Sequence, residues 1–254
     1  MFSQSVELYD AIYTNSKLKD YRAEAAALAS LIRQRRPAAA TVLDVACGTG
    51  EHAKYLSEEF GFRVDGVDIE PGFVSRSAAK VPGGTFYQAD MRDFALDARY
   101  DVVTCLFSAI GYLPSGSSVE RALRRFRAHA NPGGLVIVEP WFEPEQWHAG
   151  RVTQVTVEIE DGLVCRVTHA GQRGRTSVVD FHYLVATAGG IEHRSEVHRL
   201  RLFTRAEMMS AFAAAGLQAE YEPQGLTGRG LYLAGVPPLP SPELPGEPLA
   251  IESR

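Results

Sequence analysis

The segment 43–50 constrains the fold more than any other part of the chain. It reads Leu-Asp-Val-Ala-Cys-Gly-Thr-Gly, an apolar strand that enters a Gly48-Thr49-Gly50 turn, and a helix is expected directly behind it at 51–60. A glycine turn between a strand and a helix leaves backbone N–H groups at the helix N-terminus, where no side chain blocks a ligand. The pattern favours a nucleotide-like cofactor, although such turns also occur without any ligand.

Strands and helices alternate after this segment, which predicts an α/β fold with a doubly wound, mostly parallel seven-stranded sheet. Strands are expected at 41–46, 63–69, 85–89, 100–107, 135–139, 217–222 and 230–236, and helices at 51–60, 72–80, 118–130 and 208–215. A Thr204–Glu207 capping box precedes the last helix. Residues 37–150 and 203–236 would form the binding domain, with its ligand at the carboxyl ends of the strands.

Residues 151–202 interrupt this pattern with alternating and β-branched residues between turn signals. They predict an inserted antiparallel β meander, with strands at 152–160, 163–171, 176–186 and 191–202. A sheet of this length must cover one face, so it is expected to roof the active site or to pair with a second subunit.

The two ends of the chain differ from its middle. Residues 1–36 are expected to form helices at 5–13 and 20–35. Tyr9, Tyr13 and Tyr21 flank the loop 14–18, either as a lid over the site or as packing on the core. The segment 237–254 is rich in proline and has little to bury, so a disordered tail is expected.

Composition excludes several classes of function. The net charge is −5 and the pI about 5.8, without the basic face that nucleic acids require. The 3 cysteines, Cys47, Cys105 and Cys165, have no C-x-x-C spacing, and the 7 histidines form no metal-spaced pair, so neither disulfides nor a metal site is expected. No segment resembles a signal peptide or a membrane span, which favours a cytoplasmic protein.

Acidic residues follow two of the predicted strands. Asp68 ends the strand after the first helix, where a carboxylate can bind both hydroxyls of an adenosine ribose. Asp90 follows the next strand, where an adenine amino group would lie. A dinucleotide and S-adenosylmethionine both fit Asp68, but the glycine turn lacks a third glycine, so the pyrophosphate fingerprint is imperfect.

These motifs resemble those of class I S-adenosylmethionine-dependent methyltransferases. The resemblance is closer to the N,N-dimethyltransferases that act on nucleotide-activated aminodeoxysugars in macrolide biosynthesis, such as those making desosamine and mycaminose. The stretches that carry it are 7–10, 19–21, 43–50, 68, 89–94, 107–113, 131–134, 138–141, 195–204 and 228–231.

The resemblance implies a role for each matching residue, and it also implies a homodimer. Ala46, Gly48 and Gly50 would cradle the methionine part of S-adenosylmethionine, and Leu106 would face its amino group. Asp68 with Ile69 would bind the ribose, and Asp90 with Met91 the adenine. Tyr9 or Tyr21 would close over the cofactor.

The substrate residues follow from the chemistry of methyl transfer. An amine acceptor needs only to be held unprotonated in line with the methyl group, whereas a hydroxyl acceptor needs a general base. Tyr112 is expected to orient an amine, because a phenol with a pKa of about 10 is a poor base at neutral pH. The alternative, that Tyr112 is a loop residue that only packs against its neighbours, is left open. The other substrate-binding candidates are Tyr13, Ser108, Trp141, His198 and Arg229.

Two of these candidates have specific interpretations. Arg229, in a glycine-flanked turn, could pair with a diphosphate, or its guanidinium could be solvated. Trp141 offers a ring for stacking. The related enzymes carry two tryptophans in a row here, whereas this chain has Phe142 at the second position.

The sequence therefore predicts an S-adenosylmethionine-dependent N-methyltransferase that N,N-dimethylates the amine of a dTDP-linked aminodeoxysugar in antibiotic biosynthesis. The alternatives are a methyltransferase for another amine or for a hydroxyl acceptor, an NAD-dependent oxidoreductase, and a non-catalytic cofactor-binding module. A small-molecule sugar-nucleotide partner is expected, with no nucleic acid and no membrane.

Overall fold

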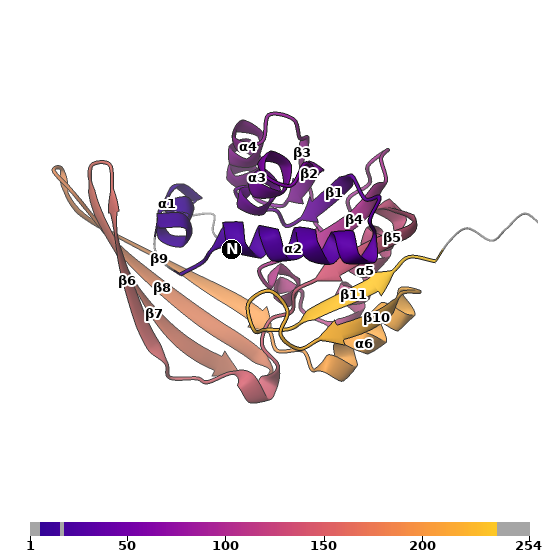
Figure 1. Cartoon of the computed structure of the whole chain (residues 1–254). Helices are drawn as coiled ribbons and strands as arrows, with labels where there is room; N and C mark the ends of the chain where they lie inside the picture. The colour runs from indigo at the N-terminus through magenta and orange to yellow at the C-terminus, as the bar shows by residue number, and fades with distance from the viewer. Residues whose placement is uncertain (1–5, 16–17, 238–254) are drawn as a thin grey trace, which may run out of the picture.

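The computed structural model describes residues 6–15 and 18–237, which form two sheets and the helices around them (Figure 1). The larger sheet has seven strands in the order β10-β11-β5-β4-β1-β2-β3. Its bounds are β1 Thr41–Val45, β2 Arg63–Asp68, β3 Phe86–Gln88, β4 Tyr100–Cys105, β5 Ala130–Val138, β10 Gln218–Glu222 and β11 Leu231–Gly235. Strands β1 to β5 pair in parallel, and β11 runs antiparallel to both of its neighbours. The predicted mostly parallel seven-stranded sheet is confirmed.

Helices cover both faces of this sheet. The bounds are α1 Val6–Asp10, α2 Tyr21–Arg35, α3 Glu51–Glu58, α4 Pro71–Lys80, α5 Gly116–His129 and α6 Arg205–Ala214, with a π-helix η1 Ala11–Asn15 and 3-10 turns η2 Ala109–Tyr112 and η3 Pro144–Gln146. Leu43 of β1 packs in the core on the side of α5 and α6, while Val42 packs on the side of α2 and α3. Because the central strands are apolar on both faces, they lie in the middle of a three-layer core.

Local signals fix where the helices begin. Helix α3 starts at Glu51, directly behind the glycine turn, as the sequence predicts. The side chain of Thr204 accepts a hydrogen bond from the backbone N–H of Glu207 at the start of α6, and the Glu207 side chain returns to the cap, so the predicted capping box is present.

The inserted residues form a separate four-stranded antiparallel sheet in the order β6-β7-β8-β9. Its bounds are β6 Val152–Ile159, β7 Gly162–Arg173, β8 Thr176–Thr187 and β9 Gly190–Arg201. On its inner face, residues such as Val164, Tyr183 and Leu200 form a third core cluster with Leu8 and Ile12 of the N-terminal helices. Helix α1 lies against this sheet in Figure 1.

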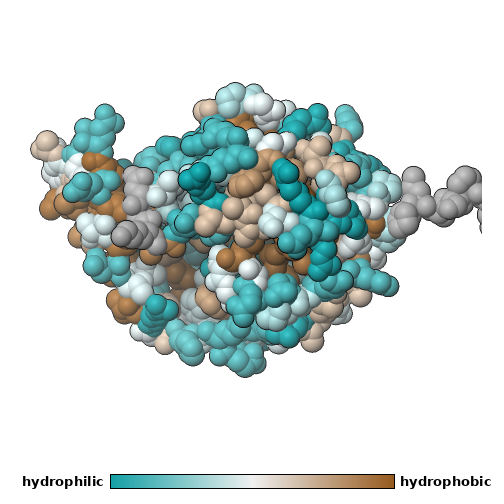
Figure 2. All heavy atoms as spheres, viewed as in Figure 1, coloured by the Kyte–Doolittle hydropathy of each residue, from teal (hydrophilic) through white to brown (hydrophobic). Residues whose placement is uncertain are grey.

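The outer face of the inserted sheet carries exposed apolar side chains. They are Val152, Leu163, Val167, Leu184 and Ile191, with Ile191 75% exposed. Figure 2 shows hydrophobic residues at the surface of this sheet, at the left edge of the view. The two faces therefore differ in role, one packed on the protein and one open.

Two expectations about local structure need correction, and a third concerns residues outside the described ranges. The first predicted helix, 5–13, ends as α1 at Asp10 and continues as the π-helix η1. Residues 131–134, which separate the predicted helix 118–130 from the predicted strand 135–139, belong to β5, whose register with β4 shifts between Tyr100 and Val102. The predicted disordered tail, 237–254, lies outside the described residues apart from its first residue.

No helix within the described ranges 6–15 and 18–237 is both long and apolar enough to cross a membrane.

Candidate active site

One cavity opens at the carboxyl ends of β1, β2 and β4, between the larger sheet and the inner face of the inserted sheet. This is the edge at which a doubly wound sheet binds ligands. The predicted site residues that line it are Tyr9, Tyr13, Tyr21, Ala46, Gly48, Asp68, Ile69, Met91, Leu106, Tyr112, Trp141, His198 and Arg229. Gly50, Asp90 and Ser108 do not line the cavity.

The glycine turn differs in detail from what its pattern suggests. Gly48 has a φ of 56° and Gly50 a φ of 79°, so both use the left-handed region that favours glycine. The Gly48 N–H donates to Asp68 Oδ2 at 2.9 Å and the Gly50 N–H to Cys47 O at 3.1 Å. These two amides therefore bond within the protein and do not point at a ligand.

Gly50 has a packing role. A Cβ atom added at Gly50 would lie 3.0 Å from Ser77 Cβ in α4, whereas one at Gly48 would meet only Tyr9 Oη, at 3.9 Å. The lack of a side chain at Gly50 thus lets α3 approach α4, and the predicted contact of Gly50 with the cofactor stays a prediction. Gly48 leaves room on the cavity side.

Asp68 lies where a ribose-binding carboxylate should lie. Its side chain accepts the Gly48 N–H at Oδ2 and the Glu70 N–H at Oδ1, both at 2.9 Å, and it is 7% exposed. Burial raises the pKa of Asp68, and these backbone hydrogen bonds oppose the rise. Each carboxylate oxygen can accept a second hydrogen bond, so Asp68 can take two hydroxyl groups from the cavity while its backbone bonds hold it in place.

Asp90 has a different partner from the one expected. It accepts hydrogen bonds from Arg92 Nε at 2.9 Å and Nη2 at 2.5 Å, and the hydrogen bond from this side chain holds the Asp90 pKa below its usual value. Asp90 therefore pairs with Arg92 and is not among the residues that line the cavity in this structure, and its predicted adenine contact stays a prediction. Its neighbour Met91 does line the cavity.

The N-terminal tyrosines lie together on the cavity wall. The rings of Tyr9 and Tyr13 are 4.7 Å apart, and the Tyr21 hydroxyl donates to the Tyr9 hydroxyl at 3.4 Å. Tyr9 and Tyr21 are 8% and 6% exposed. Burial raises the pKa of both phenols well above the usual value, so both stay neutral. These tyrosines therefore pack on the core and line the cavity, and their role as a lid stays a prediction.

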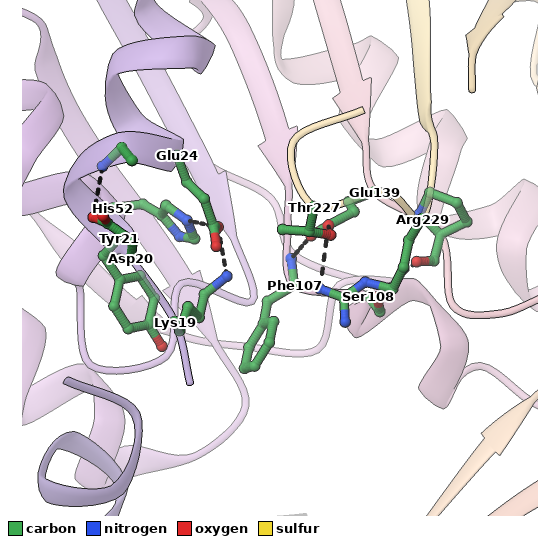
Figure 3. A network of polar contacts seen from close by, with 12 residues as sticks. Lys19, Asp20, Tyr21, Glu24, His52, Phe107, Ser108, Glu139, Thr227 and Arg229 are labelled. Atoms are coloured by element: carbon green, nitrogen blue, oxygen red, sulfur yellow. Dashed lines mark hydrogen bonds and ion pairs between the residues drawn. The ribbon is translucent and has the colours of Figure 1, made fainter. Parts of the chain in front are cut away.

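A buried charge cluster lies beside the first turns of α2 and α3 (Figure 3). Glu24 Oε2 is 2.5 Å from Lys19 Nζ and 2.9 Å from His52 Nε2. Burial alone would raise the Glu24 pKa, but the hydrogen bond from His52 and the charge of Lys19 outweigh it, so the pKa is lowered. Lys19 Nζ also lies 4.0 Å from the centre of the Phe107 ring. The cluster thus holds Lys19, in the segment before α2, against Phe107, which lines the cavity.

Glu139, at the end of β5, organises the opposite wall (Figure 3). It is fully buried and accepts the Phe107 N–H at 2.6 Å, the Thr227 hydroxyl at 2.5 Å and Arg229 Nη2 at 3.2 Å. Arg229 lines the cavity and is paired with Glu139, so the interpretation in which its guanidinium is solvated is wrong. Its charge is balanced by a carboxylate that the sequence did not single out.

The backbone after β4 is turned sharply at the cavity edge. Phe107 and Ser108 have φ values of 50° and 62°, left-handed conformations that are uncommon for residues with a side chain. The Ser108 hydroxyl donates to the carbonyl of Pro140 at 2.6 Å, and the residue is fully buried. The Ser108 hydroxyl thus joins the ends of β4 and β5 and the residue does not line the cavity in this structure, so its predicted substrate contact stays a prediction.

Aromatic residues line the part of the cavity beneath the inserted sheet. Tyr112 Oη lies 2.6 Å from His198 Nδ1, and Trp141 Nε1 donates to Ser177 Oγ at 2.8 Å. The ring of Trp141 lies 4.7 Å from Phe142 and 5.6 Å from Trp147. Trp147 therefore adds an indole to the cluster in which Phe142 stands at the position of the second tryptophan.

Sequence reasoning missed Arg166 and Phe181, which line the cavity from β7 and β8. Arg166 is 7% exposed, donates to Tyr13 Oη at 2.9 Å and lies 4.6 Å from the centre of the Phe181 ring. Alternation along a strand predicts that residues such as these share a face, but it does not say which face meets the site.

The charges in the cavity are distributed unevenly. Its lining carboxylates are Asp44, Glu51, Asp68 and Glu70, all on the segments that follow β1 and β2 or end those strands. The residues of the inserted sheet that line it are Arg166, Val179, Phe181, His198 and Leu200. One half can thus hold the polar groups of a nucleoside, and the other is aromatic and apolar with a buried cation.

Comparison with known proteins places the chain among methyltransferases. Residues 42–134 match the family model described as a methyltransferase domain. The chain is 44% identical over 232 residues to dTDP-3-amino-3,6-dideoxy-alpha-D-glucopyranose N,N-dimethyltransferase from Streptomyces fradiae, covering 91% of this chain and 90% of that protein.

Two solved structures are similar in fold and in sequence. The crystal structure of DesVI from Streptomyces venezuelae has a TM-score of 0.84 at 40% identity and covers 91% of this chain and 97% of that one. The SAM-bound structure of CalS10, an amino pentose methyltransferase from Micromonospora echinaspora involved in calicheamicin biosynthesis, has a TM-score of 0.79 at 38% identity and covers 88% and 94%.

The fold and the cavity together define an S-adenosylmethionine-dependent methyltransferase. Within that class, the chain belongs to the family of dTDP-aminodeoxysugar N,N-dimethyltransferases. The residues fit the cofactor, since Asp68 offers a carboxylate at the cavity, Gly48 leaves space beside it and Met91 and Ile69 offer apolar contacts.

Proposed function

We propose that this enzyme transfers two methyl groups to the amine of a dTDP-linked aminodeoxysugar in antibiotic biosynthesis. One observation carries the proposal: a single cavity contains two parts. The part lined by Asp44, Glu51, Asp68 and Glu70 (the cofactor cradle) would hold S-adenosylmethionine, and the aromatic part beneath the inserted sheet (the acceptor chamber) would hold the acceptor. The lining carboxylates belong to the cradle, and Tyr112 is the hydroxyl group of the chamber nearest to His198. Such a chamber suits an amine, which needs orientation and desolvation more than a strong base.

The cofactor residues have distinct tasks in this proposal. S-adenosylmethionine supplies an electrophilic methyl group when bound. Asp68 accepts hydrogen bonds from the ribose hydroxyls, while Met91 and Ile69 pack on the adenine. Gly48, Ala46 and Leu106 border the methionine part, and Tyr9 and Tyr21 cover it. Ala46 has a φ of 59°, which turns the chain sharply where β1 ends at the cavity.

The acceptor residues orient the sugar nucleotide. Tyr112 holds the amine so that its lone pair points at the methyl group from about 3 Å. Tyr13, Trp141 and Phe181 supply aromatic surface for the sugar and the base. Arg166 and Arg229 are the cationic groups that line the cavity and can pair with the diphosphate.

The remaining expectations concern assembly and movement. We propose that residues 1–36 act as a lid over the cavity, and that the inserted sheet dimerises two copies through its exposed outer face. The apolar side chains of that face support the proposal, because contiguous exposed patches commonly mark interfaces. The partner is a small molecule and not a nucleic acid. Both substrates are charged and do not cross a bilayer unaided, so we place the enzyme in the cytoplasm.

Mass spectrometry of the product tests the proposed reaction. Purified enzyme is incubated with S-adenosylmethionine and a dTDP-aminodeoxysugar, and the same sugar with a hydroxyl in place of the amine serves as the control. The expected product carries two added methyl groups on the amine, and the hydroxyl analogue is unchanged. Methylation of the hydroxyl analogue alone, or no methylation of any aminodeoxysugar tried, would refute the proposal.

A further inference from the structure

Tyr112 and His198 join two separate parts of the enzyme across the cavity. Tyr112 ends the turn η2 after β4, whereas His198 lies on the inner face of β9 in the inserted sheet. His198 is 1% exposed, its ring lies 4.9 Å from Phe181, and its Nδ1 is 2.6 Å from Tyr112 Oη. Both residues line the cavity, so this hydrogen bond lies in the part of the cavity where the acceptor is proposed to bind.

The neighbours of His198 determine the direction of that hydrogen bond. His198 Nε2 lies 3.3 Å from Glu196 Oε1, an ion-pair distance at which the two atoms do not meet hydrogen-bond geometry, so the carboxylate acts on the imidazole through its charge. A carboxylate can only accept, which assigns the proton of the neutral imidazole to Nε2 and the lone pair to Nδ1. Tyr112 therefore donates to His198, and the lone pairs of its own oxygen remain available on the cavity side.

The buried groups around His198 keep it able to accept a proton. The Glu196 carboxylate is 8% exposed and accepts the Tyr183 hydroxyl of β8 at 2.7 Å. Two cations of the described residues lie on this face: Arg166 of β7 donates to Tyr13 of η1, and Arg194 of β9 pairs with Glu7 of α1. Burial lowers the pKa of His198 below its usual value although Glu196 opposes the change, so the imidazole is neutral at neutral pH.

Tyr112 cannot itself act as an ionised base. Burial raises its pKa well above the usual value, with Tyr13 and Glu196 adding to the rise. A phenol held in this way stays protonated, and it can pass a proton to His198 only if it gains another proton at the same time. Tyr112 can therefore pass a proton on to His198, but it does not itself exist as a phenolate that could take up a proton.

We propose that Tyr112, His198 and Glu196 form a proton relay through which the enzyme uses an acceptor amine that enters in its protonated form. This inference rests on the amine acceptor proposed above. An N–H proton of the ammonium group moves to Tyr112 Oη while the Tyr112 proton moves to His198 Nδ1. The electron pair of the broken N–H bond stays on nitrogen and becomes the lone pair that attacks the methyl group.

The charges in this step balance. Tyr112 is a phenol before and after the transfer, and His198 becomes an imidazolium whose Nε2–H faces the Glu196 carboxylate. The same step serves the second methylation once His198 has released its proton to solvent during exchange of the spent cofactor, because the first methylation leaves a secondary ammonium that must lose a proton before it can react again. Tyr112 contacts the amine, whereas His198 acts through Tyr112 and is a positioning residue.

The pH dependence of kcat/KM with a dTDP-aminodeoxysugar separates a relay from a merely structural hydrogen bond. With the relay, the wild-type value stays level below the pKa of the free amine and falls only near the pKa of His198. In His198→Asn the side-chain amide can still accept from Tyr112 but cannot take up its proton, so kcat/KM should fall about tenfold per pH unit below the amine pKa. Tyr112→Phe should show the same steep profile.

The controls distinguish failure of the relay from failure of the proposed function. His148→Asn makes the same replacement at an exposed loop position and should keep the wild-type profile. Equal pH slopes in wild type and His198→Asn would overturn the relay, as would a steep profile in His198→Asn but not in Tyr112→Phe. If His198→Asn does not fold, Tyr112→Phe carries the same test. A wild-type enzyme that methylates no aminodeoxysugar would instead count against the proposed function.

Discussion

Replacing Asp68 by alanine should weaken cofactor binding strongly while leaving the fold intact. The carboxylate is 7% exposed at the cavity and is held by the N–H groups of Gly48 and Glu70. Two ribose hydroxyls bound to it would each contribute about 1.5–3 kcal/mol, the range for hydrogen bonds to charged groups. Their joint loss, about 3–6 kcal/mol, raises the dissociation constant roughly 10²- to 10⁴-fold.

Calorimetric titration with S-adenosylhomocysteine measures this loss, and Asp93→Ala supplies a matched control. Asp93 follows the neighbouring strand but pairs with Arg121 at the surface and does not line the cavity, so its removal should change the affinity little. Thermal unfolding without ligand checks that Asp68→Ala folds, since its two backbone donors lose their acceptor. Unchanged affinity in Asp68→Ala would mean that the ribose binds elsewhere. Equal losses in both variants would mean that long-range charge and not contact is responsible.

Two further predictions concern buried carboxylates near the site. Glu139→Ala leaves the Arg229 charge and two other donors without their shared acceptor, and should cost about 3–5 kcal/mol in urea unfolding; a loss under about 1 kcal/mol would show that water replaces Glu139. The contacts of Glu24 with His52 and Lys19 lower its pKa in the folded state. The ionised Glu24 carboxylate therefore stabilises the fold at pH values above its unfolded-state pKa of about 4.3, and this stabilisation is lost as the pH falls through the folded-state pKa. Glu24→Gln should therefore lower Tm at neutral pH, and the difference from wild type should shrink below about pH 4; a difference independent of pH would contradict the linkage.

The sequence determined the fold and the cofactor end of the site because both rest on short-range patterns. A strand, a glycine turn and a helix must follow one another in the chain, and parallel strands place their carboxyl ends at one edge. Asp68, Met91 and Leu106 could thus be placed near one another from their positions at strand ends alone. The inserted meander was equally visible from its alternation and turns.

Contacts that the motifs do not encode decided which of the motif residues face the cavity. Gly50 packs on Ser77, Asp90 pairs with Arg92 and the Ser108 hydroxyl bonds to the Pro140 carbonyl. A motif gives a residue its place along a strand or turn, but not the direction in which competing contacts hold it. Of these three pairs, only Asp90 and Arg92 are close enough in sequence for the pairing to have been anticipated.

Only the tertiary structure decided the acceptor half of the site. Every second residue of β7, β8 and β9 shares a face, and moving the pairing by one residue would exchange the two faces. Packing of the inserted sheet on the N-terminal helices turned Arg166, Phe181 and His198 inward and left Leu184 and Ile191 exposed. The sequence thus determined the methyl donor, while the docking of one sheet over another determined the residues that meet the acceptor.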